Sequence, residues 1–200
     1  MIEALIFDLG RVLVNIHFRG QHFRALATAL GADPDTAFAL YAGLPEVIAH
    51  NTGKLTSHEF YEAAIPGGEI CTEEEFVRGW CDIFEPIPGM EDIFRRAAAK
   101  YPITILSDTD PLHWAHLRAA LPWLELAPKP CLSYEVGALK PDPSMYAAAC
   151  AAVGRDPDKC LFIDDLAANV MGAMQFGMYG IIFDGPANLT DHLDMLGVQL

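Results

Sequence analysis

Four separated segments of the chain each place polar or charged side chains directly after a short apolar stretch. The candidate residues are Asp8, Ser107, Lys140, Asp164 and Asp165. Sites in open α/β sheets form where the carboxyl ends of parallel strands meet, so we expect these side chains to converge at one edge of a sheet. Their chemistry is therefore considered as one set.

The residue types in this set suit transfer of a phosphoryl group. Asp8 can attack phosphorus and form an acyl phosphate, which divides one difficult displacement into two easier ones. Ser107 and the backbone amides after it can hold phosphoryl oxygens. Lys140, placed before a proline, can neutralise the nucleophile and the incoming phosphate. The adjacent Asp164 and Asp165 are costly without a compensating cation, and oxygen-only donors suit Mg²⁺.

Each segment also has a structural interpretation, which the sequence leaves open. Asp8 could be a turn residue, and Ser107 could stand at a helix entry. Asp110 could cap the helix that follows it. Lys140 could be a solvated surface lysine, and the acidic pair at 164–165 could cap a helix.

A parallel sheet is the element that would position these side chains. Apolar runs that read as buried strands lie at 5–7, 103–106, 161–163 and 180–183, with a weaker candidate at 131–134. Helical patterns lie between them, at 89–100, 110–121, 143–153 and 166–176. The third opens with Asp142 before Pro143, which is an N-cap followed by an N1 proline. This alternation predicts an α/β, Rossmann-like fold whose sheet is covered on both faces.

Residues 16–85 interrupt the alternation, because no convincing strand is evident there. Their apolar residues recur at helical spacing, as at Phe23, Leu26, Ala27 and Leu30. Glycine- and proline-containing turns divide the segment into four short helices. We therefore predict a helical cap over 16–85, inserted into a core formed by 1–15 and 86–200.

Composition excludes several other classes of protein. A chain of 200 residues, 52% of them hydrophobic, can bury a substantial core. The net charge of −14 disfavours nucleic-acid and anionic membrane partners. The longest apolar runs are shorter than the roughly 18 to 20 residues that cross a bilayer, and a signal-peptide pattern is missing, so we expect a cytoplasmic protein. Five cysteines without a CxxC pair suggest neither a zinc cage nor a disulfide framework.

The order Asp, Ser, Lys, Asp-Asp resembles the haloacid dehalogenase (HAD) superfamily of hydrolases and phosphatases, and the resemblance extends from end to end. It is carried by the FDLG opening, the LSDTD second segment, the KPDP third segment and the FIDDLAANV fourth segment. The segment GKLTSHEF at 53–60 looks like a cap helix entry of the same branch. Within subfamily IA, the chain looks closest to the branch of α-D-glucose 1-phosphate phosphatases.

The resemblance implies a Mg²⁺-dependent phosphatase that acts on a small phosphorylated metabolite, such as a sugar phosphate, through a phosphorylated Asp8. Around the metal it places Asp8, the main-chain carbonyl of Gly10, Asp164 and Asp165. On the phosphoryl group it places Ser107, Asp108 and Lys140. It also implies a five-stranded sheet of order 3-2-1-4-5 and a small helical cap of the C1 type. Oligomeric state is left open.

Two residues depart from the family pattern. Gly10 stands where most phosphatases of the superfamily carry an Asp that protonates the leaving group and then activates water, and loss of such a group forfeits about 10² to 10⁴ in rate. We consider three explanations: an acidic leaving group such as an anomeric hydroxyl, a substitute at His17 or Asp110, or a slow enzyme. Asp108, where the branch usually has Asn, adds negative charge near the phosphate.

Two other functions fit parts of the pattern. A 2-haloacid dehalogenase would attack carbon with Asp8, but it needs no metal and gives the acidic pair at 164–165 no purpose. A catalytically weakened binding or regulatory protein would explain Gly10, since fold does not guarantee activity. Chelator-insensitive halide release would favour the first, and an Asp8 that is never phosphorylated would favour the second. Substrate specificity is expected in cap residues, for which the candidates are His17, Arg19, Phe23, Tyr41 and His50.

Overall fold

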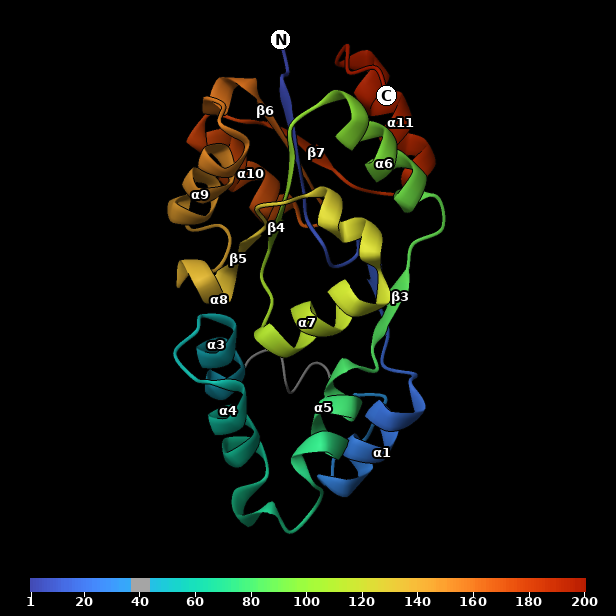
Figure 1. The fold of residues 1–200 in the computed structure, drawn as a ribbon, viewed down its shortest axis with the longest axis vertical. Coiled ribbons are helices and arrows are strands. Elements are labelled where there is room, and N and C mark those ends of the chain that lie inside the picture. Colours follow the sequence, from blue (N-terminus) through green and yellow to red (C-terminus); the bar gives the residue numbers. More distant parts are fainter. Residues whose placement is uncertain (37–43) are drawn as a thin grey trace.

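A five-stranded sheet, parallel throughout, forms the centre of the computed structural model, which describes residues 1–36 and 44–200 (Figure 1). Its strands are β1 (Ala4–Phe7), β4 (Ile103–Ser107), β5 (Cys131–Leu132), β6 (Cys160–Asp164) and β7 (Tyr179–Ile182). They lie in the order β5-β4-β1-β6-β7. Counted along the chain within this sheet, that is the predicted order 3-2-1-4-5.

The sheet is covered on both faces because alternate residues of its strands face opposite ways. Leu5 and Phe7 of β1 join one apolar cluster, whereas Ala4 and Ile6 join the other. The first face carries α6 (Met90–Lys100), α7 (Pro111–Ala120) and α11 (Pro186–Met195), and the second carries α9 (Pro143–Val153) and α10 (Ala167–Phe176). A strand buried on both sides has no polar alternation, which explains the continuous apolar runs.

Local signals in the sequence correspond closely to the longer helices. The four predicted helical stretches match α6, α7, α9 and α10, and the Asp142 side chain caps α9 by accepting a hydrogen bond from the Ser144 amide. The expected apolar runs correspond to β1, β4, β6, β7 and the two-residue β5. Helix α11 was not predicted, nor were the short η2 (Pro122–Leu126), α8 (Ser133–Val136) and η3 (Pro157–Lys159).

A group of helices forms the end of the molecule farthest from both termini (Figure 1). Its described members are α1 (Gln21–Ala29), α3 (Pro45–Asn51), α4 (Ser57–Ala64), the short η1 (Pro66–Gly68) and α5 (Glu73–Cys81). Capping boxes begin α4 and α5, in which Thr56 and Thr72 each exchange hydrogen bonds with a glutamate three residues later. These helices pack around an apolar cluster of their own. We propose that residues 16–85 form a cap and that residues 1–15 and 86–200 form the core.

A short antiparallel ribbon connects the two groups of elements. It pairs β2 (Val14–Ile16) with β3 (Phe84–Pro86), so Ile16 lies opposite Phe84. The expectation that 16–85 contains no strand is therefore wrong at both ends of that range. Each strand has three residues, too few for a recognisable alternation, and the partner of each lies far away in the sequence.

The cysteines of this chain are free thiols, and most of them are buried. Cys81, Cys131, Cys150 and Cys160 are buried, Cys71 is partly exposed, and all five are free. In the part of the chain that is described, no helix combines the length and the apolar character needed to cross a membrane. The cytoplasmic location remains a prediction.

Candidate active site

The central strands deliver two aspartates to one point. Phe7 at the end of β1 pairs with Ile163 of β6, so Asp8 follows beside Asp164. The Asp8 amide donates to the Ile163 carbonyl at 2.9 Å, which extends the parallel ladder to the nucleophile candidate itself. Both side chains are buried, with Asp8 6% and Asp164 0% exposed. Strand order, rather than sequence proximity, brings these carboxylates together.

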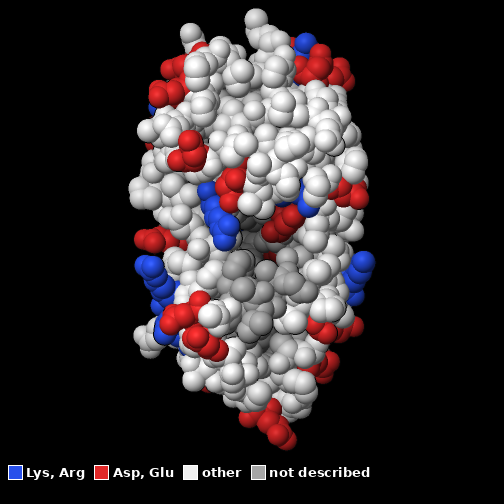
Figure 2. All heavy atoms as spheres, turned by 180° about the vertical axis from the view of Figure 1, so that it is seen from behind, with Lys and Arg blue, Asp and Glu red and all other residues white. Residues whose placement is uncertain are grey.

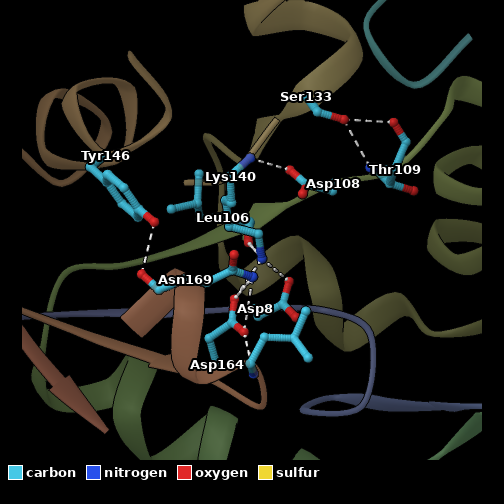
Figure 3. A network of polar contacts seen from close by, with 10 residues as sticks. Asp8, Leu106, Asp108, Thr109, Ser133, Lys140, Tyr146, Asp164 and Asn169 are labelled. Carbon is cyan, nitrogen blue, oxygen red and sulfur yellow. Dashed lines mark hydrogen bonds and ion pairs between the residues drawn. The ribbon is translucent and has the colours of Figure 1, made fainter. Parts of the chain in front are cut away.

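Lys140 lies between the two aspartates (Figure 3). Its Nζ donates to Asp8 Oδ1 at 2.6 Å, to Asp164 Oδ2 at 2.7 Å and to the Leu106 carbonyl at 3.3 Å. Its side chain is only 2% exposed. The interpretation of Lys140 as a solvated surface lysine is therefore excluded.

Several groups hold this arrangement in place (Figure 3). The Lys140 amide donates to Asp108 Oδ1 at 2.9 Å, so the Asp108 carboxylate is anchored beside the lysine backbone. Asn169 Nδ2 donates to both oxygens of Asp164, at 3.2 and 3.0 Å, and the Tyr146 hydroxyl donates to the Asn169 carbonyl at 2.8 Å. Sequence reasoning gave Asn169 no role, although its spacing after the acidic pair was a usable signal.

Ser133 is a second supporting residue that the sequence did not reveal. Its hydroxyl oxygen accepts a hydrogen bond from the Thr109 amide and donates one to the Thr109 carbonyl, both at 2.9 Å (Figure 3). These contacts fix the loop that follows Ser107 at the end of β4. Ser133 is completely buried and lies in a different segment, so no local pattern could have identified it.

The electrostatics of the cluster are dominated by burial and by an excess of negative charge. Burial raises the pKa of Asp8 to about 7, with a further increase from Asp164 and an opposing effect of Lys140. Burial alone would lower the pKa of Lys140, but Asp8 and Asp164 raise it above its ordinary value. Burial, followed by Asp164, also raises the pKa of Asp165. One ammonium thus compensates a group of three carboxylates incompletely.

The carboxylates fit a divalent cation. Asp8, Asp164 and Asp165 each offer an oxygen, and these oxygens lie within 4.8 Å of one another. An all-oxygen set of this kind suits Mg²⁺, which retains several waters and tolerates few protein ligands. Arg11, whose φ of 58° places it in the left-handed region, brings Nη1 to 3.8 Å from Asp165 Oδ2 at the edge of the group. The donor set and its uncompensated charge therefore both match such an ion.

Gly10, Ser107 and Asp108 line a cavity of about 230 Å³, whereas Asp8, Lys140, Asp164 and Asp165 are not among its lining residues. Residues of the helical group, among them Phe23 and Trp80, form other parts of its lining. The face drawn in Figure 2 has a hollow near its middle with basic and acidic side chains around it. Ser107 and Asp108, two of the three predicted phosphate-binding residues, thus line the same cavity as residues far away in the sequence.

Comparison with known protein families agrees with the family resemblance seen in the sequence. The model for haloacid dehalogenase-like hydrolases matches residues 2–177. The chain belongs to this family. The resemblance carried by its four segments is thereby confirmed, and so is the fold that the resemblance implies.

Curated relatives of this HAD-like hydrolase are named for reactions of phosphate esters. D-ribitol-5-phosphate phosphatase of Bacteroides thetaiotaomicron is 27% identical over 88% of this chain and 89% of its own length. Flavin mononucleotide hydrolase 1 of Arabidopsis thaliana is 31% identical over 57% of this chain, which corresponds to 46% of its own length. The organic parts of the substrates in these two names differ greatly.

Solved structures share the fold. A HAD family enzyme of Bacteroides thetaiotaomicron, in complex with magnesium and inorganic phosphate, has a TM-score of 0.80 and 24% identity, covering 92% of this chain and 96% of its own. A 2-haloacid dehalogenase of Pseudomonas syringae has a TM-score of 0.66 and 17% identity, covering 98% and 100%. At these identities the likeness concerns the fold alone.

Asp110, one of the two candidate substitutes for an acid at Gly10, already has several structural contacts. Asp110 is completely buried and accepts hydrogen bonds from Trp80 Nε1 at 3.0 Å and from the His113 amide at 2.8 Å, with His113 Nδ1 at 2.9 Å. Burial would raise the pKa of Asp110, but His113 lowers it to about 2. In this HAD-like hydrolase Asp110 is the N-cap of α7. The sequence had left open whether Asp110 is a helix cap or a substitute acid.

The specificity candidates are divided by the structure. Phe23 lines the cavity, whereas His17, Arg19 and His50 are not among its lining residues. His50 is completely buried and stacks on Phe60, with the ring centroids 4.4 Å apart. Tyr41 lies outside the described residues. Asn51, Phe18 and Phe84 line the cavity and were not proposed from the sequence.

Proposed function

We propose that this protein is a Mg²⁺-dependent phosphomonoester hydrolase that forms an aspartyl-phosphate at Asp8. The observation that carries the proposal is the buried group in which Asp8, Asp164 and Asp165 offer oxygens within 4.8 Å while Lys140 contacts two of them. Membership of the hydrolase family and relatives named as phosphatases support it. Its substrate would be a small phosphorylated metabolite.

In the first step, an oxygen of Asp8 forms a bond to phosphorus as the bond from phosphorus to the ester oxygen breaks. Ser107 and the amides of its loop would hold the phosphoryl oxygens, and Asp108 would lie beside them. Lys140 is positioned at Asp8 and would balance the charge that accumulates there. The carbonyl of Gly10 is proposed as a further metal ligand. Bound Mg²⁺ would supply positive charge to the carboxylates and to the phosphoryl group.

In the second step, water attacks phosphorus, the bond to Asp8 breaks, and inorganic phosphate leaves. Because Gly10 supplies no acid, the departing alkoxide must take its proton from water. This requirement should make turnover slower than in a relative with an Asp at that position, by about 10² to 10⁴.

The dehalogenase alternative is less well supported by the site. Displacement at carbon by Asp8 needs no cation, and it would leave three clustered carboxylates with the Lys140 ammonium and, at the edge, the Arg11 guanidinium. Chloride release from 2-chloropropionate that persists in EDTA would restore this alternative.

The test is release of inorganic phosphate from p-nitrophenyl phosphate and a panel of sugar phosphates, with Mg²⁺ and with EDTA. We expect Mg²⁺-dependent turnover that falls by at least about 10³-fold in Asp8→Asn, because the variant lacks the nucleophile. Asp142→Asn is the matched control, since Asn is an equally good N-cap for α9 and the residue is exposed.

Turnover that is absent from the wild type on every ester, or equal in the wild type and Asp8→Asn, would reject the proposal. A folded protein that binds phosphate with Mg²⁺ but never turns over would favour a binding or regulatory function instead.

A further inference from the structure

The lining of the cavity comes from two different parts of the fold. Gly10 and Ser107 follow the sheet strands β1 and β4. Phe23 of α1 and Val47 and Asn51 of α3 come from the helical group. At about 230 Å³ the cavity is smaller than the roughly 300 to 1,000 Å³ of sites for drug-sized ligands. It suits the organic part of a small ester.

Aromatic side chains form much of the described lining. Phe18, Phe23, Trp80 and Phe84 all contribute, together with aliphatic residues. The Phe18 and Phe23 rings lie 5.2 Å apart in a tilted arrangement. Aromatic walls favour a flat apolar ring, because offset and edge-to-face contacts add to the gain from burial.

Polar groups in the lining offer few contacts to a substrate with many hydroxyls. The Asp110 carboxylate already accepts from Trp80 and His113, and His113 Nε2 lies 3.0 Å from the Trp80 carbonyl. The Thr109 amide and carbonyl are both bonded to Ser133. A polyol tail would therefore lose water contacts that the walls do not replace, at roughly 10-fold in affinity for each hydroxyl left unpaired.

Asn51 is the exception among these polar groups. Its Oδ1 is buried and, within the described part of the chain, has no hydrogen-bond partner. Buried acceptors are nearly always satisfied in native proteins, so an unsatisfied one at a cavity wall points to a ligand that donates to it. Asn51 belongs to α3, so it is one of the residues that the helical group contributes to the cavity wall.

We propose that the substrate is a phosphate monoester whose organic part is a single flat, mainly apolar ring with one hydrogen-bond donor, which Asn51 accepts. This proposal rests on the proposed phosphatase function and narrows its substrate class. It departs from the sugar phosphates that the family resemblance implies, because the aromatic and aliphatic walls and the unsatisfied Oδ1 of Asn51 match a ring with one donor better than a polyol.

The test compares three phosphate esters of primary alcohols: 2-phenylethyl phosphate, 2-(4-hydroxyphenyl)ethyl phosphate and ribitol 5-phosphate. All three release a primary alkoxide, so differences in kcat/KM report the tail rather than leaving-group acidity. We expect both ring esters to exceed ribitol 5-phosphate by at least about 10-fold, and the hydroxylated ring to be the better of the two.

Two conservative variants connect this preference to the cavity. Phe18→Leu keeps an apolar wall but removes a flat one, and should reduce the preference for both rings over ribitol 5-phosphate. Asn51→Leu should lower kcat/KM for the hydroxylated ring about 3- to 10-fold and leave the unsubstituted ring nearly unchanged. Ile48→Leu, at an exposed position of the same helix, is the control and should change neither value. Circular dichroism confirms that each variant is folded.

The outcomes separate this inference from the function on which it rests. If no ester is hydrolysed above the Asp8→Asn background, the phosphatase proposal fails. If esters are hydrolysed but ribitol 5-phosphate equals or exceeds the rings, the phosphatase proposal stands and the ring inference is overturned. A ring preference that survives unchanged in both cavity variants would also overturn it, because the tail would then bind elsewhere.

Discussion

Two buried aspartate clusters near the same cavity differ in how their charge is balanced. In the first, which we call the Lys140 cluster, Asp8 and Asp164 share one ammonium. In the second, the Asp110 cluster, a single carboxylate accepts from Trp80 and the His113 amide and also contacts the His113 ring. The pKa of Asp8 is raised to about 7, chiefly by burial, whereas His113 overcomes burial and lowers the pKa of Asp110 to about 2.

We infer from this difference that the Lys140 cluster can react, whereas the Asp110 cluster stabilises the fold. The single carboxylate of the Asp110 cluster already has contacts from Trp80 Nε1, the His113 amide and the His113 ring, and the contacts join α5 to α7. Carboxylates outnumber cations in the Lys140 cluster, so a further cation would be favourable. Three experiments test this contrast.

The largest effect is expected from removing the cation of the first cluster. Lys140→Met leaves Asp8 and Asp164 buried without a charge partner, and should lower the free energy of unfolding by about 3–5 kcal/mol. Urea denaturation without metal measures it. The matched change in the second cluster, His113→Gln, keeps an amide donor and should cost about 2 kcal/mol, because the effect of His113 on the pKa of Asp110 is lost. Equal costs in the two variants would contradict the contrast.

The second effect concerns Mg²⁺. An ion that binds only the folded state adds stability by mass action, about 2.7 kcal/mol at 100 times its dissociation constant. We expect Mg²⁺ to raise the unfolding temperature of the wild type and of Asp110→Asn by similar amounts, and to have a much smaller effect on Asp165→Asn. Loss of the Mg²⁺ effect in Asp110→Asn, rather than in Asp165→Asn, would reverse the assignment of the two clusters.

The smallest effect concerns acid stability through Asp110. Its folded-state pKa, about 2, lies below the ordinary value of 3.8, so its contribution is present above pH 3.8 and is lost as the pH falls toward 2. The contribution is about 2 kcal/mol. The stability difference between the wild type and Asp110→Asn, measured by urea unfolding, should be constant above about pH 5 and shrink below pH 4. A stability difference that does not depend on pH would show that the negative charge of Asp110 does not stabilise the folded protein.

The sequence was most informative where the determining contacts are local or repeated. Apolar runs predicted the strands because both faces of the sheet are covered, and Asp142 marked the start of α9. Convergence of Asp8 and Asp164 followed from their positions at the ends of strands, whereas Lys140 is separated from β5 by α8. The order of the strands, however, came from the family resemblance, because no apolar pattern specifies which strands are neighbours.

The sequence was least informative where the contacts join distant segments. Ser133 supports the loop at Thr109, and Trp80 reaches Asp110 from another helix, but neither pairing leaves a mark in the local pattern. Asp110 therefore remained both a helix cap and a candidate acid until its donors were known. Asn51 could not be identified as a cavity residue, because its environment depends on how the helices meet the sheet.

The ribbon of β2 and β3 has a consequence for how the chain can be divided. Ile16 and Phe84 are paired residues, so the two ends of the intervening helical segment are held at the spacing of neighbouring strands. A two-residue hairpin turn is sufficient to join strands at that spacing. The helical segment could therefore be excised, or exchanged for one of different length, without moving the ends of the sheet to which it is attached. Both covalent connections between the helical segment and the rest of the chain therefore pass through this one ribbon.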